Sequence, residues 1–76
     1  MFKAVVVTSN GQPWVIFESR NFEECASFLA KRSLGSPFLL GELVINENDV
    51  VVGSPDSKLI GKPLKDAIAF LLRRCS

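Results

Sequence analysis

Two cysteines, Cys25 and Cys75, are the first residues to consider as nucleophiles. Catalysis by a cysteine or serine normally needs an oriented base, which in the common dyads and triads is histidine. Histidine is absent from all 76 residues, so those dyads and triads are excluded. Cys25 also falls within the apolar stripe of a predicted helix, where a thiol packs as a small apolar group. We therefore expect no catalytic cysteine.

The cysteines also bear on metal binding and on the cellular compartment. A structural zinc site needs about four Cys or His ligands, which one copy of this chain cannot supply. Reduced thiols are typical of cytosolic proteins, although a Cys25–Cys75 disulfide stays open because aligned helices would bring the two together. No apolar stretch approaches the roughly 18 residues of a membrane span, and none resembles a signal peptide. We predict a cytoplasmic protein with no cofactor, no metal and no membrane segment.

The carboxylates and the glycine-containing loop give no pattern that indicates catalysis. Residues 53–62 resemble a phosphate-binding loop in composition, but Gly61-Lys62 is followed by Pro63, where the motif has Ser or Thr. Proline also lacks the amide that a phosphate would accept at a helix start. No carboxylates are spaced as an acid–base pair, and we predict that the chain is not an enzyme. The carboxylates considered are Glu23, Glu24, Glu42, Glu47, Asp49 and Asp56.

Basic residues gather where the two predicted helices end. If the helices lie side by side, these ends form a stripe able to contact phosphates. Positive charge at a helix C-terminus also complements the helix dipole, and nine basic against eight acidic residues give no general attraction to nucleic acid. Binding of nucleic acid is therefore the alternative function and not the leading one. The residues that would carry it are Lys31, Arg32, Arg73 and Arg74.

The first half of the chain predicts a β-hairpin followed by a helix. Residues 2–8 and 14–18 are rich in β-branched and aromatic side chains, and Asn10-Gly11 between them is a strong hairpin signal. Asn21 suits the N-cap position, with Glu24 three residues on as in a capping box. Three-and-four spacing then places one apolar stripe on the helix. That stripe consists of Phe22, Cys25, Ala26 and Leu29.

The second half repeats this order of elements. Residues 42–45 and 50–52 predict strands around the turn 46–49, and Pro63 suits the first position of a second helix. The two helical segments align with Phe28 on Phe70. Two interpretations stay open: an internal duplication of a ββα unit, or two amphipathic helices that align by chance. The stripe of the second helix consists of Leu64, Ala67, Ile68, Leu71 and Cys75.

This order predicts a single α+β domain over residues 1–76, with half-repeats 1–35 and 38–76 if the duplication is real. A ββα unit is too small to hide the apolar side of its own hairpin. Two units can instead form one four-stranded antiparallel sheet. We therefore predict a two-layer ββαββα fold with both helices on one face of the sheet.

The predicted strands are apolar on both sides, which determines the functional hypothesis. Two helices on one face leave the other face bare, and monomers seldom leave such a patch uncovered. Three solutions exist: the sheet packs on a second copy, it binds a partner, or the helices divide between the faces. We predict the first two, that is, a homo-oligomeric protein–protein interaction module or regulatory adaptor. Its outward set is either Trp14 and Ile16 or Val15 and Phe17, and the predicted partner-binding residues are Trp14, Ile16, Val44 and Val51.

Overall fold

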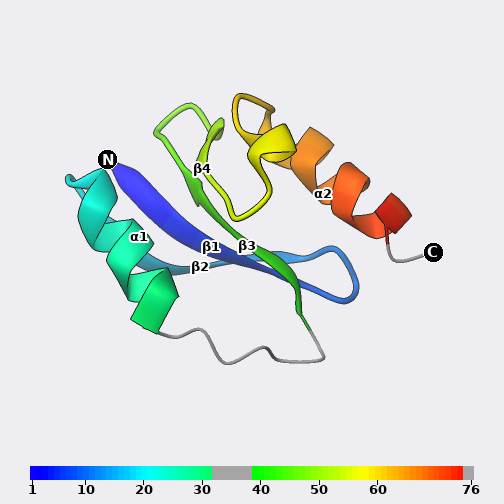
Figure 1. The fold of residues 1–76 in the computed structure, drawn as a ribbon, viewed down its shortest axis with the longest axis horizontal. Helices are drawn as coiled ribbons and strands as arrows, with labels where there is room; N and C mark the ends of the chain where they lie inside the picture. Colours follow the sequence, from blue (N-terminus) through cyan, green and yellow to red (C-terminus); the bar gives the residue numbers. More distant parts are fainter. Residues whose placement is uncertain (32–38, 75–76) are drawn as a thin grey trace.

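The computed structural model describes residues 1–31 and 39–74 of the chain. Its four strands form one antiparallel sheet in the order β2-β1-β3-β4 (Figure 1). The α+β class and the four-stranded antiparallel sheet are thus confirmed. The elements are β1 (Phe2–Thr8), β2 (Pro13–Ser19), α1 (Phe22–Lys31), β3 (Leu39–Ile45), β4 (Val51–Gly53), the 3-10 turn η1 (Ser57–Leu59) and α2 (Leu64–Arg74).

The predicted hairpin turn joins β1 to β2. The amide of Gly11 donates to the carbonyl of Thr8 at 2.9 Å, and the amide of Thr8 donates to the carbonyl of Gln12 at 2.9 Å. Gly11 has a φ of 80°, a conformation that glycine adopts without a steric penalty. There is also little room for a side chain at this position, because a Cβ on Gly11 would lie 2.9 Å from Leu72 Cδ1 in α2. The turn therefore packs on α2 as well as reversing the chain.

The predicted N-cap of α1 is also present, and Ser19 takes part in it as an additional residue. Asn21 Oδ1 accepts from the amide of Glu23 at 2.9 Å. The Glu24 carboxylate does not reach back to the Asn21 amide as in a simple capping box. Instead it accepts from the hydroxyl of Ser19 at 2.9 Å, and that hydroxyl accepts from the Asn21 amide at 3.1 Å. Ser19 thus ties the end of β2 directly to the start of α1.

The two helices lie on opposite faces of the sheet, so the prediction of both helices on one face is wrong. Val5 and Val7 of β1 share a core cluster with Ala67 and Leu71 of α2. Their neighbours in the strand share a separate cluster with Cys25 of α1. Because successive side chains of a strand point to opposite faces, α1 and α2 must cover different sides. Figure 1 shows the sheet between them. We call these sides the α1 face and the α2 face.

Burial of the two central strands explains this division. Four consecutive residues of β1, Ala4 to Val7, are buried, and so are three consecutive residues of β3, Leu43 to Ile45. A strand with apolar side chains on both sides gains stability only if both sides are covered. The short β2–α1 connection places α1 on one face. The longer segment from Gly53 to Leu64, which includes η1, brings α2 to the other.

The opposite placement also bears on the predicted duplication. β1 and β3 are adjacent and antiparallel, so a two-fold axis that exchanges the two ββα halves must stand perpendicular to the sheet. Such an axis would place both helices on one face of the sheet, whereas the structure has them on opposite faces. The two halves as folded are therefore not related by that symmetry, and a common origin of the halves stays a prediction from the sequence.

Leu43 tests the importance of the core on the α2 face. Its side chain is buried in the cluster beneath α2, so Leu43→Ala should lower the free energy of unfolding by about 2–5 kcal/mol. Leu72→Ala makes the same chemical change at an exposed position of α2 and should cost far less. Urea unfolding followed by circular dichroism measures both. Equal losses for the two variants would contradict the described core.

Candidate functional site

Each face of the sheet is only half covered. Four strands spaced about 4.8 Å apart form a layer roughly twice as wide as one helix of about 10 Å diameter. On the α1 face, the helix packs on β1 and β2 and reaches Val44 of β3, which is buried, so that β4 and the adjoining side of β3 are only partly covered. On the α2 face, the helix packs over β3 and the centre of the sheet, which leaves β2 open. The two uncovered regions therefore lie on opposite faces and at opposite edges.

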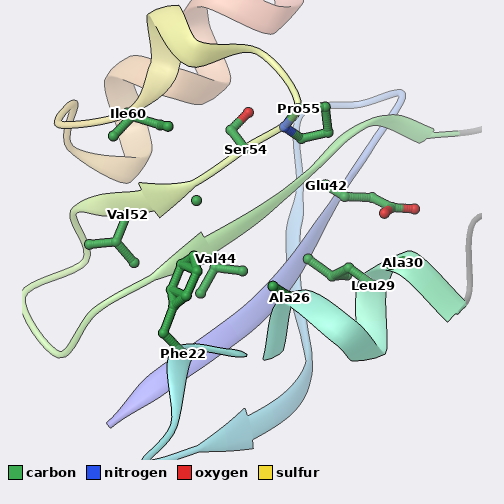
Figure 2. A pocket seen from close by; sticks show the side chains of 11 residues that line it. Phe22, Ala26, Leu29, Ala30, Glu42, Val44, Val52, Ser54, Pro55 and Ile60 are labelled. Atoms are coloured by element: carbon green, nitrogen blue, oxygen red, sulfur yellow. The ribbon is translucent and has the colours of Figure 1, made fainter. Parts of the chain in front are cut away.

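The uncovered region of the α1 face forms a groove with a volume of about 480 Å³. Helix α1 forms one wall, β3 and β4 form the floor, and the segment after β4 forms the other wall (Figure 2). The lining is almost entirely apolar, which is typical of a binding site for another molecule. The residues that line this groove are Phe22, Ala26, Leu29, Ala30, Glu42, Val44, Val52, Gly53, Ser54, Pro55 and Ile60.

The floor of the groove depends on Gly53, which stands opposite Val44 in the β3–β4 pairing. A Cβ at Gly53 would lie 2.9 Å from Cε1 and Cζ of the Phe22 ring. Glycine within a strand often marks a place where another group approaches the backbone closely, and here that group is Phe22. The Phe22 ring also makes an edge-to-face contact with the ring of Phe2, with ring centroids 5.9 Å apart. Gly53 and Phe2 together hold the ring at one end of the groove.

The wall opposite α1 is fixed by polar contacts. Ser54 Oγ accepts from the amide of Asp56 at 3.1 Å, and Asp56 Oδ1 accepts from the amide of Lys58 at 3.0 Å. The second carboxylate oxygen of Asp56 accepts from Arg74 Nη1 at 2.8 Å. These contacts tie the segment after β4 to η1 and to the last turn of α2. The groove is therefore formed in the free chain, before any partner binds.

Among the described residues, Glu42 is the one charged side chain that lines the groove. It stands opposite Val6 in the β1–β3 pairing, on the α1 face, and it is half-buried. Within residues 1–31 and 39–74 its carboxylate makes no hydrogen bond or ion pair. Figure 2 shows Glu42 at the end of the groove opposite to Ile60. The groove thus combines a long apolar floor with an anionic end.

The second uncovered region is the edge strand β2. Trp14 keeps 61% of its surface exposed and Val15 keeps 50%. Trp14 stands opposite Val6 and Val15 opposite Val5, so the two side chains flank the edge from the α1 face and the α2 face respectively. In the described part of the chain no strand pairs with the outer side of β2. This edge therefore offers unpaired main-chain groups between two exposed apolar side chains.

The other edge of the sheet is closed by the chain itself. The amide of Val51 in β4 donates to the carbonyl of Lys62 at 2.9 Å, and the amide of Gly61 donates to the carbonyl of Val51 at 2.8 Å. Val50 also forms a bridge with Pro63. Covering an edge in this way is a common protection against unwanted strand pairing. Of the two edges, β2 is the one left open.

The predicted partner-binding residues do not form one surface. Trp14 is exposed, but Ile16 is half-buried against the α1-face cluster and Val44 is buried in that cluster. Val51 has no exposed surface and lies on the α2 face. Phe17, the alternative to Trp14 and Ile16, stacks on Phe28 of α1 with ring centroids 4.6 Å apart. Among these residues the structure leaves Trp14 most available to a partner, with Val15 beside it.

The predicted nucleic-acid residues are also not brought together. Lys31 ends α1 and Arg73 and Arg74 end α2, and the two helices are on opposite faces of the sheet. Arg74 already pairs with Asp56. Arg32 lies outside the described residues. The single basic stripe that the alternative function requires is therefore not formed by the described helix ends.

Cys25 is a free thiol, buried under α1. Burial raises the pKa of the Cys25 thiol above its ordinary value, a hydrogen bond with the Ser19 backbone lowers it, and the negative charge of Glu24 raises it further. The net effect is a higher pKa, which is opposite to what a reactive thiolate needs. Cys75, the other half of the disulfide left open by the sequence, lies outside the described residues.

Two further features bear on metal binding and membranes. Across residues 1–31 and 39–74, no three His, Cys, Asp or Glu side chains lie together so as to hold a metal ion. None of the helices in the described part of the chain has the length and apolar character needed to cross a bilayer.

Comparisons with protein-family models, with curated proteins and with solved structures found no match.

The groove was not predicted from the sequence, although two signals for it are present. Gly53 follows directly on the apolar run that forms β4, which indicates close approach of another group. Ala26 and Ala30 are four residues apart in α1, so both lie on one side of the helix and leave room beside it. The predicted stripe included Ala26 and treated it as core, whereas the structure places Ala26 at the border of the core, where it lines the groove.

Gly53→Ala tests the close contact that forms the groove floor. Alanine in a strand is normally favoured over glycine, but here the new methyl group collides with the Phe22 ring. We expect the free energy of unfolding to fall by about 1–3 kcal/mol. In a Phe22→Ala background the same change should cost much less, because the two residues are in contact. Urea unfolding of the four proteins measures the coupling, and equal costs in both backgrounds would contradict the contact.

Cys25 should make stability depend on alkaline pH. Its pKa is raised in the folded state, so the stability that the protonated thiol contributes is complete below its ordinary pKa of 9.0 and is lost as the pH rises through the folded value. In a Cys75→Ser background, the urea midpoint should fall more between pH 7 and pH 10 with Cys25 present than with Cys25→Ala. Iodoacetamide should modify Cys25 slowly at pH 8 and quickly in urea. Fast modification of the native protein would contradict a buried, protonated thiol.

Proposed function

We propose that the protein is a small cytoplasmic protein–protein interaction module or regulatory adaptor, that it acts as a homo-oligomer, and that it has no catalytic activity. The observation that carries this proposal is the open edge strand β2, with Trp14 and Val15 exposed on either side of it. An exposed edge can pair with a strand of another chain through main-chain hydrogen bonds, while pockets for alternate side chains give specificity. The proposed interface is β2 of one copy against β2 of a second.

The features of β2 suit a controlled pairing. Pro13 at its first position lacks a donor, and the register shift opposite Ala4 and Val5 interrupts its regularity. Such devices restrict an edge to particular partners and prevent open-ended aggregation. Antiparallel pairing of β2 with its copy about a two-fold axis would join the two four-stranded sheets into one continuous sheet, and a two-fold contact closes after two copies.

Burial of Trp14 is the largest single gain in this interface. A tryptophan buries at most roughly 150–250 Å², so covering the exposed part of Trp14 corresponds to about 3 kcal/mol per copy at about 25 cal/mol per Å². Association costs at least several kcal/mol in lost translational and rotational freedom. Trp14 alone therefore does not suffice, and Val15 and the main-chain bonds of β2 must add to it. A net charge of +1 adds little repulsion between copies.

Trp14→Lys tests the proposal. Light scattering coupled to gel filtration at micromolar concentration should give the wild-type chain at least twice its mass of 8.4 kDa. The variant should run as a monomer, because a charged side chain at an exposed edge disfavours pairing. Ile60→Lys is the matched control, since Ile60 is similarly exposed but lies away from β2 in the groove wall, and it should keep the wild-type mass.

Two outcomes would overturn the proposed function. A wild-type chain that stays monomeric across the micromolar range would remove self-association. A Trp14→Lys variant that is folded and keeps the wild-type mass would move the interface elsewhere. The salt concentration distinguishes this function from the alternative, nucleic-acid binding. Raising it from about 50 to about 200 mM should leave the apolar interface intact, whereas binding through phosphate contacts would weaken steeply.

A further inference from the structure

We propose that the groove beside α1 binds an amphipathic α-helix of a second protein, with the apolar side of that helix on β3 and β4 and a basic side chain against Glu42. The proposal rests on the function proposed above in that both are protein binding. It uses a different surface from β2, on the opposite edge of the sheet, so either one can fail without the other.

The size of the groove matches one helix. The groove lies over β3 and β4, and two strands span roughly 10 Å, which is the diameter of a helix with its side chains. The groove runs beside α1, which has 10 residues and is therefore about 15 Å long. A helix of about three turns matches this length; its volume exceeds the groove volume of about 480 Å³, so only its apolar side would lie inside the groove. Such a helix would complete the second half of the helical layer, which α1 alone leaves open.

The side of α1 that faces the groove is suited to helix packing. Phe22, Ala26 and Ala30 line the groove and are spaced four residues apart, so they form one of the rows along which helices pack. The side chains at positions 26 and 30 are small, which permits the axis of a neighbouring helix to approach to about 8 Å. Phe22 closes the row at the end of the groove that lies over Gly53.

The charge of the groove determines the chemistry of the occupant. Glu42 is half-buried at one end and has no ionic partner in residues 1–31 and 39–74. The carboxylate of Asp56, the residue after Pro55 of the wall, is already paired with Arg74. A carboxylate covered by an apolar partner would lose its hydration without compensation. The occupant must therefore carry Lys or Arg at this end.

A helix fits these features better than a small molecule does. The groove lies between α1 on one side and Ser54 and Pro55 on the other (Figure 2), and it is partly open to solvent. Recognition of an amphipathic helix in such a groove relies on a row of apolar side chains at three-and-four spacing. The half-buried Val52 and the exposed Ile60 provide the apolar contacts for that row, above Val44, which is already buried in the core.

A displayed library of helix-stabilised peptides, selected against the full chain, tests the proposal. The enriched peptides should carry apolar residues at three-and-four spacing and one Lys or Arg. Selection against Glu42→Lys should instead enrich Asp or Glu at that peptide position. Peptides from the first selection should bind Glu42→Lys at least about tenfold more weakly, and exchanging their basic residue for Glu should restore binding.

Matched alanine positions locate the binding site. Ala30→Gln places a longer side chain in the groove at an exposed position of α1 and should weaken peptide binding at least about tenfold. Ala69→Gln makes the same change at an exposed position of α2 and should leave the affinity within about twofold. Trp14→Lys should also leave it unchanged, whatever its effect on self-association.

Three results would overturn the proposal. The first is that no selected peptide is weakened by Ala30→Gln more than by Ala69→Gln. The second is that the selected peptides lack helical spacing or show no dependence on the charge at position 42. The third is that no peptide is enriched while octylamine, a small cationic amphiphile, binds the wild-type chain and is weakened by Ala30→Gln. That result would assign the groove to small ligands.

Discussion

The structure depends on the burial of its two central strands from both sides. β1 and β3 carry apolar side chains on successive positions, so neither face of the sheet can be left to water. With two helices available, one on each face is the arrangement that covers both strands. The absence of any buried polar or charged residue from the described core agrees with a sheet held together by apolar packing on its two sides. All other features of the surface follow from this division.

One helix per face covers the centre of the sheet and leaves half of each face. On the α1 face the remainder becomes a groove, because α1 presents small residues to it and the segment after β4 forms a fixed wall. On the α2 face the remainder is the side of β2 that carries Val15, next to the open strand edge, while Trp14 stands on the α1 face of the same strand. The two proposed binding surfaces thus have the same cause, which is that one helix covers only part of each face of the sheet. They lie far apart in the sheet order, which allows one to be used without blocking the other.

Local signals in the sequence were reliable where the interaction is itself local. Asn10-Gly11 turns the first hairpin and Asn21 caps α1, because these roles depend on main-chain geometry and on hydrogen bonds between near neighbours. The capping arrangement differs in detail, since Ser19 stands between Glu24 and Asn21, and this contact depends on how β2 enters the helix. The predicted partner-binding residues do not lie on one surface, because the sequence does not tell which helix covers which face of the strands. Val51 is buried under α2 for that reason.

The sequence by itself determined the order of elements, the antiparallel hairpins and the fact that both sides of the strands are apolar. Those properties follow from residue types and spacing over a few neighbouring positions. Only the tertiary structure decided that α2 crosses to the face opposite α1, since the segment from Gly53 to Leu64 is long enough to reach either side and the choice depends on total burial. It also decided that Gly53 supports Phe22, because that contact joins residues far apart in the chain. The groove exists only through such long-range contacts, whereas Trp14 was named from the sequence as part of one of the two sets expected on an apolar sheet face.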